Sequence, residues 1–168
     1  MNRRNIVLIG MPGAGKSTVG VLLAKTLGMP FLDIDLLIQQ SEGKLLQDII
    51  NNSGIDVFQA IEEKTILGLN TEGHIIATGG SAVYSRKAME HLKENGTIVY
   101  LKSKLYQIEK RIKNISSRGI VIGKGQTLRE LYAERTPLYE AFADITVDCS
   151  GKHIETVIAE IKEINSGL

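Results

Sequence analysis

Residues 10–18, GMPGAGKST, have the types and the spacing that bind a polyphosphate chain. They match the pattern G-x-x-x-x-G-K-[S/T] at every position, directly after a short apolar run and before an amphipathic stretch. Glycines let successive N–H groups point into one concavity, Lys16 brings a positive charge to the β- and γ-phosphates, and the Ser17 hydroxyl is placed for Mg²⁺. We predict a nucleotide site whose contacts are Gly13, Ala14, Gly15, Lys16, Ser17 and Thr18.

Two carboxylates, Asp33 and Asp35, come at the end of the next apolar run. If that run is a strand over 31–34, alternation points both side chains to the same side, near the phosphate loop. One carboxylate could order the Mg²⁺ shell, and the other could accept the proton of a substrate hydroxyl. Asp35 fits equally well as the N-cap of the helical stretch that follows it.

A glycine pair and two arginines complete the candidate chemistry. Gly79 and Gly80 follow the third apolar run, where they permit close approach of a ligand or form a plain turn. Arg118 lies in a Ser- and Gly-rich connection, 114–126, and Arg135 in a later helical stretch. A guanidinium suits a phosphate or a carboxylate, although either arginine alone could be a solvated charge.

Several other polar side chains are expected to play no part in this chemistry. Glu62 and Glu63 are predicted to lie on a solvated helix face, and Lys124 is predicted to be solvated. The three histidines are scattered, without a partner at ligand spacing, and the single cysteine, Cys149, is expected to be a buried bystander.

Alternating elements must position these residues. Five short apolar runs, at 6–9, 31–34, 74–77, 97–101 and 144–147, alternate with helical stretches at 16–27, 36–69, 86–93, 104–113, 128–142 and 154–164. The long stretch is expected to divide at Gly43 and at Ser53-Gly54. The pattern predicts one α/β domain over 1–168, with three αβα layers and a five-stranded parallel sheet.

Composition excludes several classes of function. Aromatic residues make up 5% of the chain, there is no Trp, and the formal net charge is +1, which argues against a nucleic-acid partner. No apolar stretch approaches the roughly 20 residues that cross a bilayer. One cysteine excludes an internal disulfide. We therefore expect no membrane partner and a cytoplasmic location.

The chain resembles the shikimate kinases, P-loop kinases of the nucleoside-monophosphate-kinase-like group. The segments that carry the resemblance are 10–18 (GMPGAGKST), 33–35 (DID), 54–63 (GIDVFQAIEE), 77–83 (ATGGSAV), 111–118 (RIKNISSR) and 134–140 (ERTPLYE). They follow the family's order and spacing over nearly the whole chain. The resemblance implies a kinase that uses ATP and Mg²⁺ to phosphorylate the 3-hydroxyl of shikimate in aromatic amino acid biosynthesis, most often as a monomer.

The resemblance also implies roles for the residues of the acceptor site. Asp33 holds the water shell of Mg²⁺ and assists proton removal, and Asp35 binds ring hydroxyls. Gly79 and Gly80 offer backbone N–H groups, and Arg135 pairs with the acceptor carboxylate.

On the nucleotide side, the resemblance implies that Arg111 lies by the adenine. It further implies a mobile lid over about 113–125, which brings Arg118 to the transferring phosphoryl group. A helix-surface charge beside Lys110 and Lys113 is the other reading of Arg111.

Three positions depart from the family's usual residues. Gln59 stands where an arginine usually grips the acceptor carboxylate, Ser81 where a third glycine is usual, and Gly119 where proline follows the lid arginine. Gln59 donates only neutral hydrogen bonds, which are roughly half as strong as charge-assisted ones. Gly119 is expected to loosen the open lid.

These departures leave three functions open. The first is a shikimate kinase in which Gln59 contributes to a weakened acid-binding corner. The second is a paralogue that phosphorylates another small alcohol or a sugar acid. The third is a nucleotide-binding protein without turnover, against which Lys16, Ser17, Asp33 and Arg118 weigh.

Overall fold

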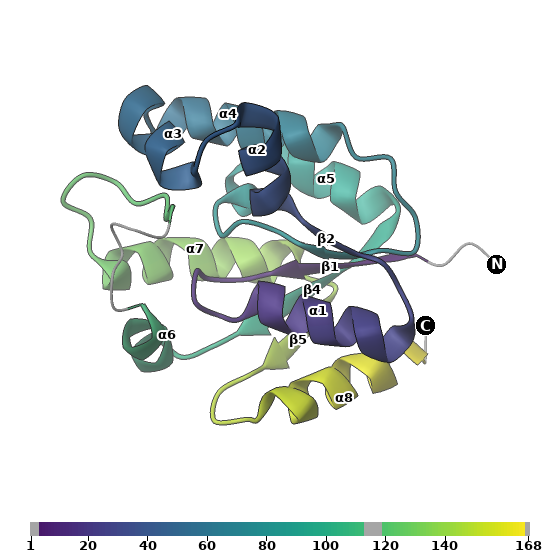
Figure 1. Cartoon of the computed structure of the whole chain (residues 1–168). Helices are drawn as coiled ribbons and strands as arrows, with labels where there is room; N and C mark the ends of the chain where they lie inside the picture. Colours follow the sequence, from purple (N-terminus) through teal and green to yellow (C-terminus); the bar gives the residue numbers. More distant parts are fainter. Residues whose placement is uncertain (1–3, 113–118, 167–168) are drawn as a thin grey trace.

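The five apolar runs form one parallel sheet, with strands in the order β2-β3-β1-β4-β5 (Figure 1). The computed structural model describes residues 4–112 and 119–166. The strands are β1 (Asn5–Ile9), β2 (Phe31–Asp33), β3 (Ile75–Ala77), β4 (Gly96–Lys102) and β5 (Ile145–Asp148). The predicted five-stranded parallel sheet is confirmed.

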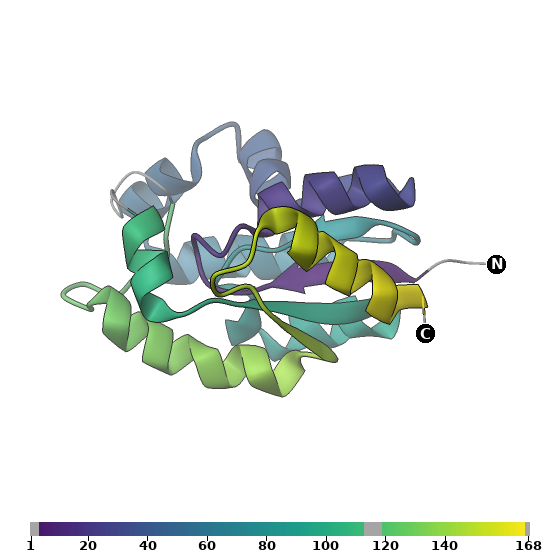
Figure 2. The same cartoon turned by 90° about the horizontal axis from the view of Figure 1, so that it is seen from below.

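Helices cover both faces of this sheet, which gives the predicted three layers (Figure 2). They are α1 (Lys16–Leu27), α2 (Ile34–Glu42), α3 (Leu46–Ser53), α4 (Ile55–Leu67), α5 (Arg86–Glu94), α6 (Leu105–Arg111), α7 (Leu128–Phe142) and α8 (Ile154–Ser166), with a 3₁₀ turn η1 at Ala82–Tyr84. The long helical stretch divides where predicted, at Gly43 and Gly54, each of which has a positive φ. No helix in the described part of the chain is long and apolar enough to span a membrane.

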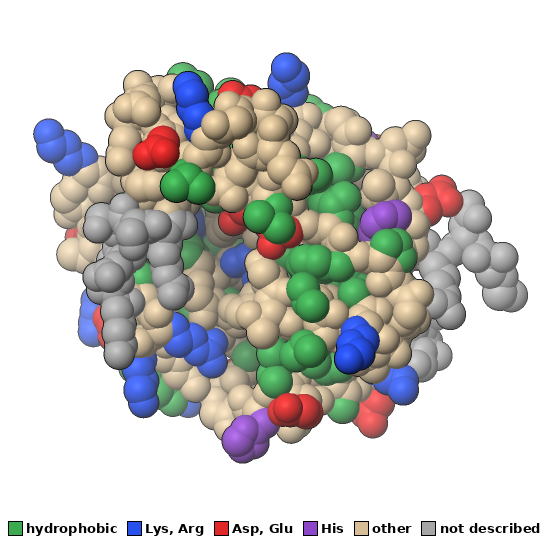
Figure 3. Space-filling view, viewed as in Figure 1, with side chains coloured by type: hydrophobic (Ala, Val, Ile, Leu, Met, Phe, Trp, Pro, Cys, Tyr) green, Lys and Arg blue, Asp and Glu red, His purple; other side chains and the backbone are tan. Residues whose placement is uncertain are grey.

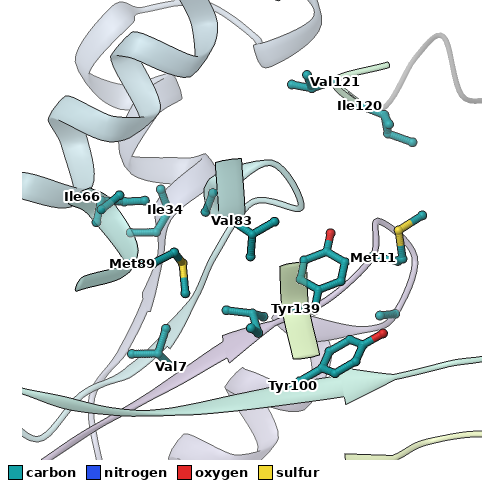
Figure 4. Packing of buried hydrophobic residues seen from close by; sticks show 14 of the residues in the cluster. Val7, Met11, Ile34, Ile66, Val83, Met89, Tyr100, Ile120, Val121 and Tyr139 are labelled. Atoms are coloured by element: carbon teal, nitrogen blue, oxygen red, sulfur yellow. The ribbon is translucent and has the colours of Figure 1, made fainter. Parts of the chain in front are cut away.

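Alternate residues of the central strand enter two separate cores. Ile6 and Leu8 pack with α1 and α8, whereas Val7 and Ile9 pack on the opposite face with α5 and α7. A strand whose side chains are buried on both faces is mostly apolar, which explains the run Ile6–Ile9, whereas the buried Asn5 at its start hydrogen-bonds to the backbone of Thr71 and His74. Tyr100 and Tyr139 stack in the larger core, with ring centroids 5.2 Å apart (Figure 4).

The second strand ends one residue earlier than the sequence predicted. β2 stops at Asp33 and α2 begins at Ile34, because the Asp33 side chain caps the helix by accepting from the N–H groups of Asp35 and Leu36. Asp33 therefore holds the capping position considered for Asp35, and that reading of Asp35 is wrong. Asp35 belongs to the first helical turn, so strand alternation does not place the two acids.

The carboxyl ends of the parallel strands meet at one edge of the sheet, and the phosphate loop, α2, α3 and residues 119–125 gather there (Figure 1). Within that last segment, Ile120 and Val121 are buried and join the larger core (Figure 4). The first part of the expected lid, 113–118, lies outside the described residues, and the expected mobility stays a prediction.

Candidate active site

The loop between β1 and α1 has the geometry of an anion nest. Gly13 and Gly15 adopt positive φ angles of 78° and 92°, which turn backbone N–H groups toward one concavity. Lys16 is buried, and its Nζ donates to the carbonyls of Gly10 and Met11 at 2.8 and 2.9 Å. Burial lowers the pKa of Lys16 to about 8, and the nearby Asp35 carboxylate opposes this effect. The loop thus presents a positive charge and oriented donors to a polyanion.

A hydroxyl and a carboxylate meet beside this loop. Ser17 Oγ donates to Asp33 Oδ2 at 2.6 Å, while Asp33 Oδ1 accepts from the N–H of Asp35 at 3.0 Å. The helix cap therefore fixes the orientation of the Asp33 carboxylate. Two hard oxygen ligands fit Mg²⁺, which keeps several waters and takes further oxygens from phosphates. No larger group of acidic, histidine or cysteine ligands exists among residues 4–112 and 119–166.

A cavity of about 330 Å³ opens between the phosphate loop and α2 (Figure 3). It is lined by Pro12, Gly13, Gly15, Lys16, Ser17, Thr18, Asp35, Phe58, Thr78, Gly79, Gly80, Ser81, Gly119, Ile120, Val121 and Arg135. Figure 3 shows acidic and basic side chains close together in the hollow of this face. The cavity thus unites most of the predicted substrate residues with the phosphate loop.

Asp35 supplies the carboxylate of this cavity. Burial, and secondarily the negative charge of Asp33, raise the pKa of Asp35 to about 6. A carboxylate with a raised pKa binds a proton more readily than an exposed one, which suits a group that receives the proton of a substrate hydroxyl.

The glycine pair is required by close packing of side chains. A Cβ on Gly79 would overlap Glu62 Oε1, and a Cβ on Gly80 would lie 2.9 Å from Arg135 Nη1 and from Pro12 Cδ. Neither glycine has a positive φ. The missing Cβ atoms therefore let the Glu62 carboxyl group pack against Gly79 and the Arg135 guanidinium against Gly80.

Arg135 is a lining residue of the cavity, and one end of its guanidinium has no hydrogen-bond partner among the described residues. Its side chain is 1% exposed, Nε donates to Tyr84 Oη at 3.2 Å, and Nη2 donates to the carbonyl of Val121. Nη1 is buried and has no hydrogen-bond partner within the described part of the chain. A buried cationic donor without a partner is costly, so an anionic ligand oxygen would complete it.

Glu62 contradicts its predicted place on a solvated face. It is 2% exposed, and its Oε2 accepts from Ser81 Oγ at 2.6 Å. Burial is the main cause that raises the pKa of Glu62 to about 7. The sequence does contain a signal for this burial. Phe58, Glu62 and Ile66 recur every four residues and form the buried stripe of α4. Glu63 is only partly buried and accepts from Ser85 Oγ.

Gln59 lies apart from the main cavity. It lines a neighbouring cavity of about 240 Å³ together with Glu62, Glu63 and Tyr84, and Ser81 borders both cavities. Ser81 is the residue that the linings of both cavities share, and Gln59 belongs only to the second.

Arg111 lies on the other side of the phosphate loop. Its Nη1 donates to the Gly13 carbonyl at 3.2 Å, and it borders a third cavity of about 280 Å³. Further residues of this cavity, which the sequence reading did not connect with it, are Cys149, Lys152, Ile154 and Val157. Cys149 is buried, as expected. Arg118 lies outside the described residues.

Comparison with known proteins agrees with this geometry. Residues 12–165 match the family model for shikimate kinases. The chain belongs to the shikimate kinase family. It is 36% identical to a shikimate kinase of Persephonella marina, over 94% of this chain and 96% of that protein. It is also 37% identical to one of Pasteurella multocida, over 99% and 97% of the two chains.

Solved structures place the whole fold within the same family. A shikimate kinase from Acinetobacter baumannii in complex with shikimate matches with a TM-score of 0.91 and 30% identity, over 98% of this chain and 94% of that one. The enzyme from Aquifex aeolicus matches with a TM-score of 0.80 at 30% identity, over 97% and 96%. A gluconokinase from Sinorhizobium meliloti, at 18% identity and a TM-score of 0.57, shares only the fold.

Proposed function

We propose that this chain transfers the γ-phosphoryl group of ATP to the 3-hydroxyl of shikimate. The observation that carries the proposal is the main cavity, where Asp35 and the free Nη1 of Arg135 lie beside the phosphate loop. A small acceptor with hydroxyls and one carboxylate fits such a pair of opposite charges. The relatives named above carry the same activity in their names.

The phosphate loop binds the donor in this proposal. When ATP binds, Lys16 Nζ replaces its hydrogen bonds to the carbonyls of Gly10 and Met11 with contacts to oxygens of the β- and γ-phosphates. The backbone N–H groups of residues 13–18 surround the chain of phosphates. The third cavity, bordered by Arg111, accommodates the adenine.

Ser17 and Asp33, whose side chains meet beside the phosphate loop, would hold the metal in this proposal. Mg²⁺ neutralises charge on the β- and γ-phosphates when it is bound. Helix capping keeps Asp33 oriented before any ligand arrives, so the site is preorganised.

Asp35 orients the acceptor hydroxyl toward the γ-phosphoryl group and receives its proton, with Asp33 close enough to assist. Gly79 and Gly80 offer N–H groups to the acceptor, and Arg135 Nη1 completes its bonds with the acceptor carboxylate. Arg118 stabilises charge on the transferring group as the segment that carries it closes. Positioning and electrostatics supply most of the catalysis, because phosphoryl transfer needs little covalent help.

The test is ADP formation from ATP and Mg²⁺, measured with shikimate, gluconate or a nucleoside monophosphate as acceptor. We expect shikimate alone to stimulate turnover, and Lys16→Ala to lower kcat by about 100-fold or more. Lys25→Ala removes an exposed lysine of the same helix and serves as the matched control. Near-normal turnover in Lys16→Ala would refute the assignment.

A second candidate is a kinase for another small alcohol or a sugar acid. It is favoured by Gln59, since a neutral side chain lines the neighbouring cavity where the family usually has an arginine. Turnover with gluconate and silence with shikimate would select it. Tight ATP binding without turnover on any acceptor would select a binding protein.

We also propose a monomeric enzyme in the cytoplasm, without nucleic-acid or membrane partners. The neutral balance of charge and the single buried Cys149 support this. Sedimentation at micromolar concentration tests the oligomeric state.

A further inference from the structure

Residues 119–121 form one wall of the main cavity and are held from two sides. Gly119, Ile120 and Val121 all line the cavity. On one side, Arg135 donates from Nη2 to the Val121 carbonyl. On the other side, Gln47 of α3 accepts from the Gly119 N–H, with Oε1 at 3.0 Å from the nitrogen. The wall thus connects the acid-binding arginine with a helix outside the cavity.

Gly119 meets three requirements of this contact at once. Its φ is +62°, which L side chains rarely adopt. A Cβ at this position would lie 2.5 Å from Leu46 Cβ, so the loop backbone packs directly against α3. The bond to Gln47 needs an N–H group. Proline, the family's usual residue here, has no N–H and a φ fixed near −65°, so it could not make this contact.

The sequence predicts a loosened open loop, because glycine has more backbone freedom than proline, and this stays a prediction. The structure adds a specific attachment of Gly119 to Leu46 and Gln47. The backbone freedom of glycine is what allows the loop to reach α3.

Neighbouring contacts fix the orientation of Gln47. Its Nε2 donates to Asn51 Oδ1 at 2.9 Å, which leaves Oε1 directed at Gly119. The start of α3 is in turn tied to α2, because the Leu46 N–H donates to Gln39 Oε1 at 3.2 Å. Because α2 also carries Asp35, a short chain of contacts links this hydroxyl-binding acid to the wall formed by residues 119–121.

We propose that Gln47 is a positioning residue for the acceptor. By holding Gly119, it sets the distance between residues 119–121 and the rest of the cavity lining. The inference rests on the proposed function for its kinetic consequence. Gln47 does not line the main cavity, so it acts through Gly119 and not by touching the acceptor. The cavity proposed for the adenine is not bordered by 119–121, so we expect the effect to fall mainly on the acceptor.

The kinetic test compares Gln47→Leu, which removes the acceptor oxygen, with Gln47→Glu, which keeps one. Losing one net hydrogen bond should raise the KM for shikimate roughly three- to tenfold in Gln47→Leu. The KM for ATP should stay within about twofold, and Gln47→Glu should restore most of the loss. Asn52→Ala changes an exposed side chain of the same helix and is the matched control. An unchanged shikimate KM in Gln47→Leu, or an equal rise in both KM values, would overturn the proposal.

A second measurement needs no substrate. Amide hydrogen exchange should be slow at Gly119 in the wild type, fast in Gln47→Leu and slow again in Gln47→Glu. Equal exchange in the three proteins would overturn the attachment itself. If shikimate does not stimulate turnover by the wild-type protein but the exchange pattern is as expected, the proposed function is wrong and the attachment of Gly119 to Gln47 is still supported.

Discussion

Replacing Glu62 with Gln should stabilise the protein above neutral pH and leave it nearly unchanged in acid. The substitution keeps the shape of the side chain and an oxygen for the Ser81 hydroxyl, and it removes the ionisable group. Glu62 is 2% exposed, and its Oε1 has no hydrogen-bond partner among the described residues. Its charged form is therefore disfavoured by the fold.

The magnitude follows from the pKa of Glu62, which burial raises from 4.5 to about 7. Each pH unit between these values corresponds to 1.36 kcal/mol, so the full effect is roughly 3 kcal/mol. Below pH 4.5 both folded and unfolded chains hold the proton, and Glu62 costs nothing. As the pH rises toward 7, only the unfolded chain releases the proton, so the free energy of unfolding falls; above 7 the loss is complete.

Urea unfolding of both proteins at several pH values between 4.5 and 8 measures this difference. We expect the free energy of unfolding of Glu62→Gln to rise steadily relative to that of the wild type over this range. At pH 8 the variant should be more stable by roughly 3 kcal/mol. Glu63→Gln, on the same helix but only partly buried, is the control and should show a much flatter difference. A difference in the free energy of unfolding between Glu62→Gln and wild type that is the same at pH 5 and pH 8 would show that the fold does not disfavour the charged form of Glu62.

Three further predictions concern the chemistry. Asp35→Asn should lower kcat by roughly 100-fold or more with little change in the KM for ATP, because the proton acceptor is lost; steady-state kinetics check this. Ser17→Ala and Asp33→Asn should each raise the Mg²⁺ concentration that gives half-maximal turnover, and a magnesium titration unchanged in both would exclude this metal site. Gln59→Arg should lower the shikimate KM, since a guanidinium near Ser81, which borders both cavities, adds a charge-assisted donor for the acceptor carboxylate; an unchanged KM would separate Gln59 from acid binding.

The phosphate loop and the sheet could be predicted because their signals are local. All the groups that make the anion nest lie within nine consecutive residues, and the strand before them is apolar because both of its faces are covered. The helix stops at Gly28, Gly43 and Gly54 likewise depend on the conformation of single residues.

The acceptor side could be predicted only in part, because it depends on contacts between distant segments. One residue separated the predicted end of β2 from the observed end, and it moved the helix cap from Asp35 to Asp33. The four-residue spacing of Phe58, Glu62 and Ile66 indicates that Glu62 is buried, but no local pattern reveals that Ser81 and Gly79 lie against it. Gly119 similarly required knowledge of α3, which lies about 70 residues earlier in the sequence.

Transfer of a phosphoryl group to shikimate can be followed by ³¹P NMR of a mixture of the protein, ATP, Mg²⁺ and shikimate. We expect the γ-phosphate resonance of ATP to decay while one phosphomonoester resonance grows in equal amount, with no inorganic phosphate. A folded protein that binds ATP and yields only inorganic phosphate, or no new resonance at all, would contradict it.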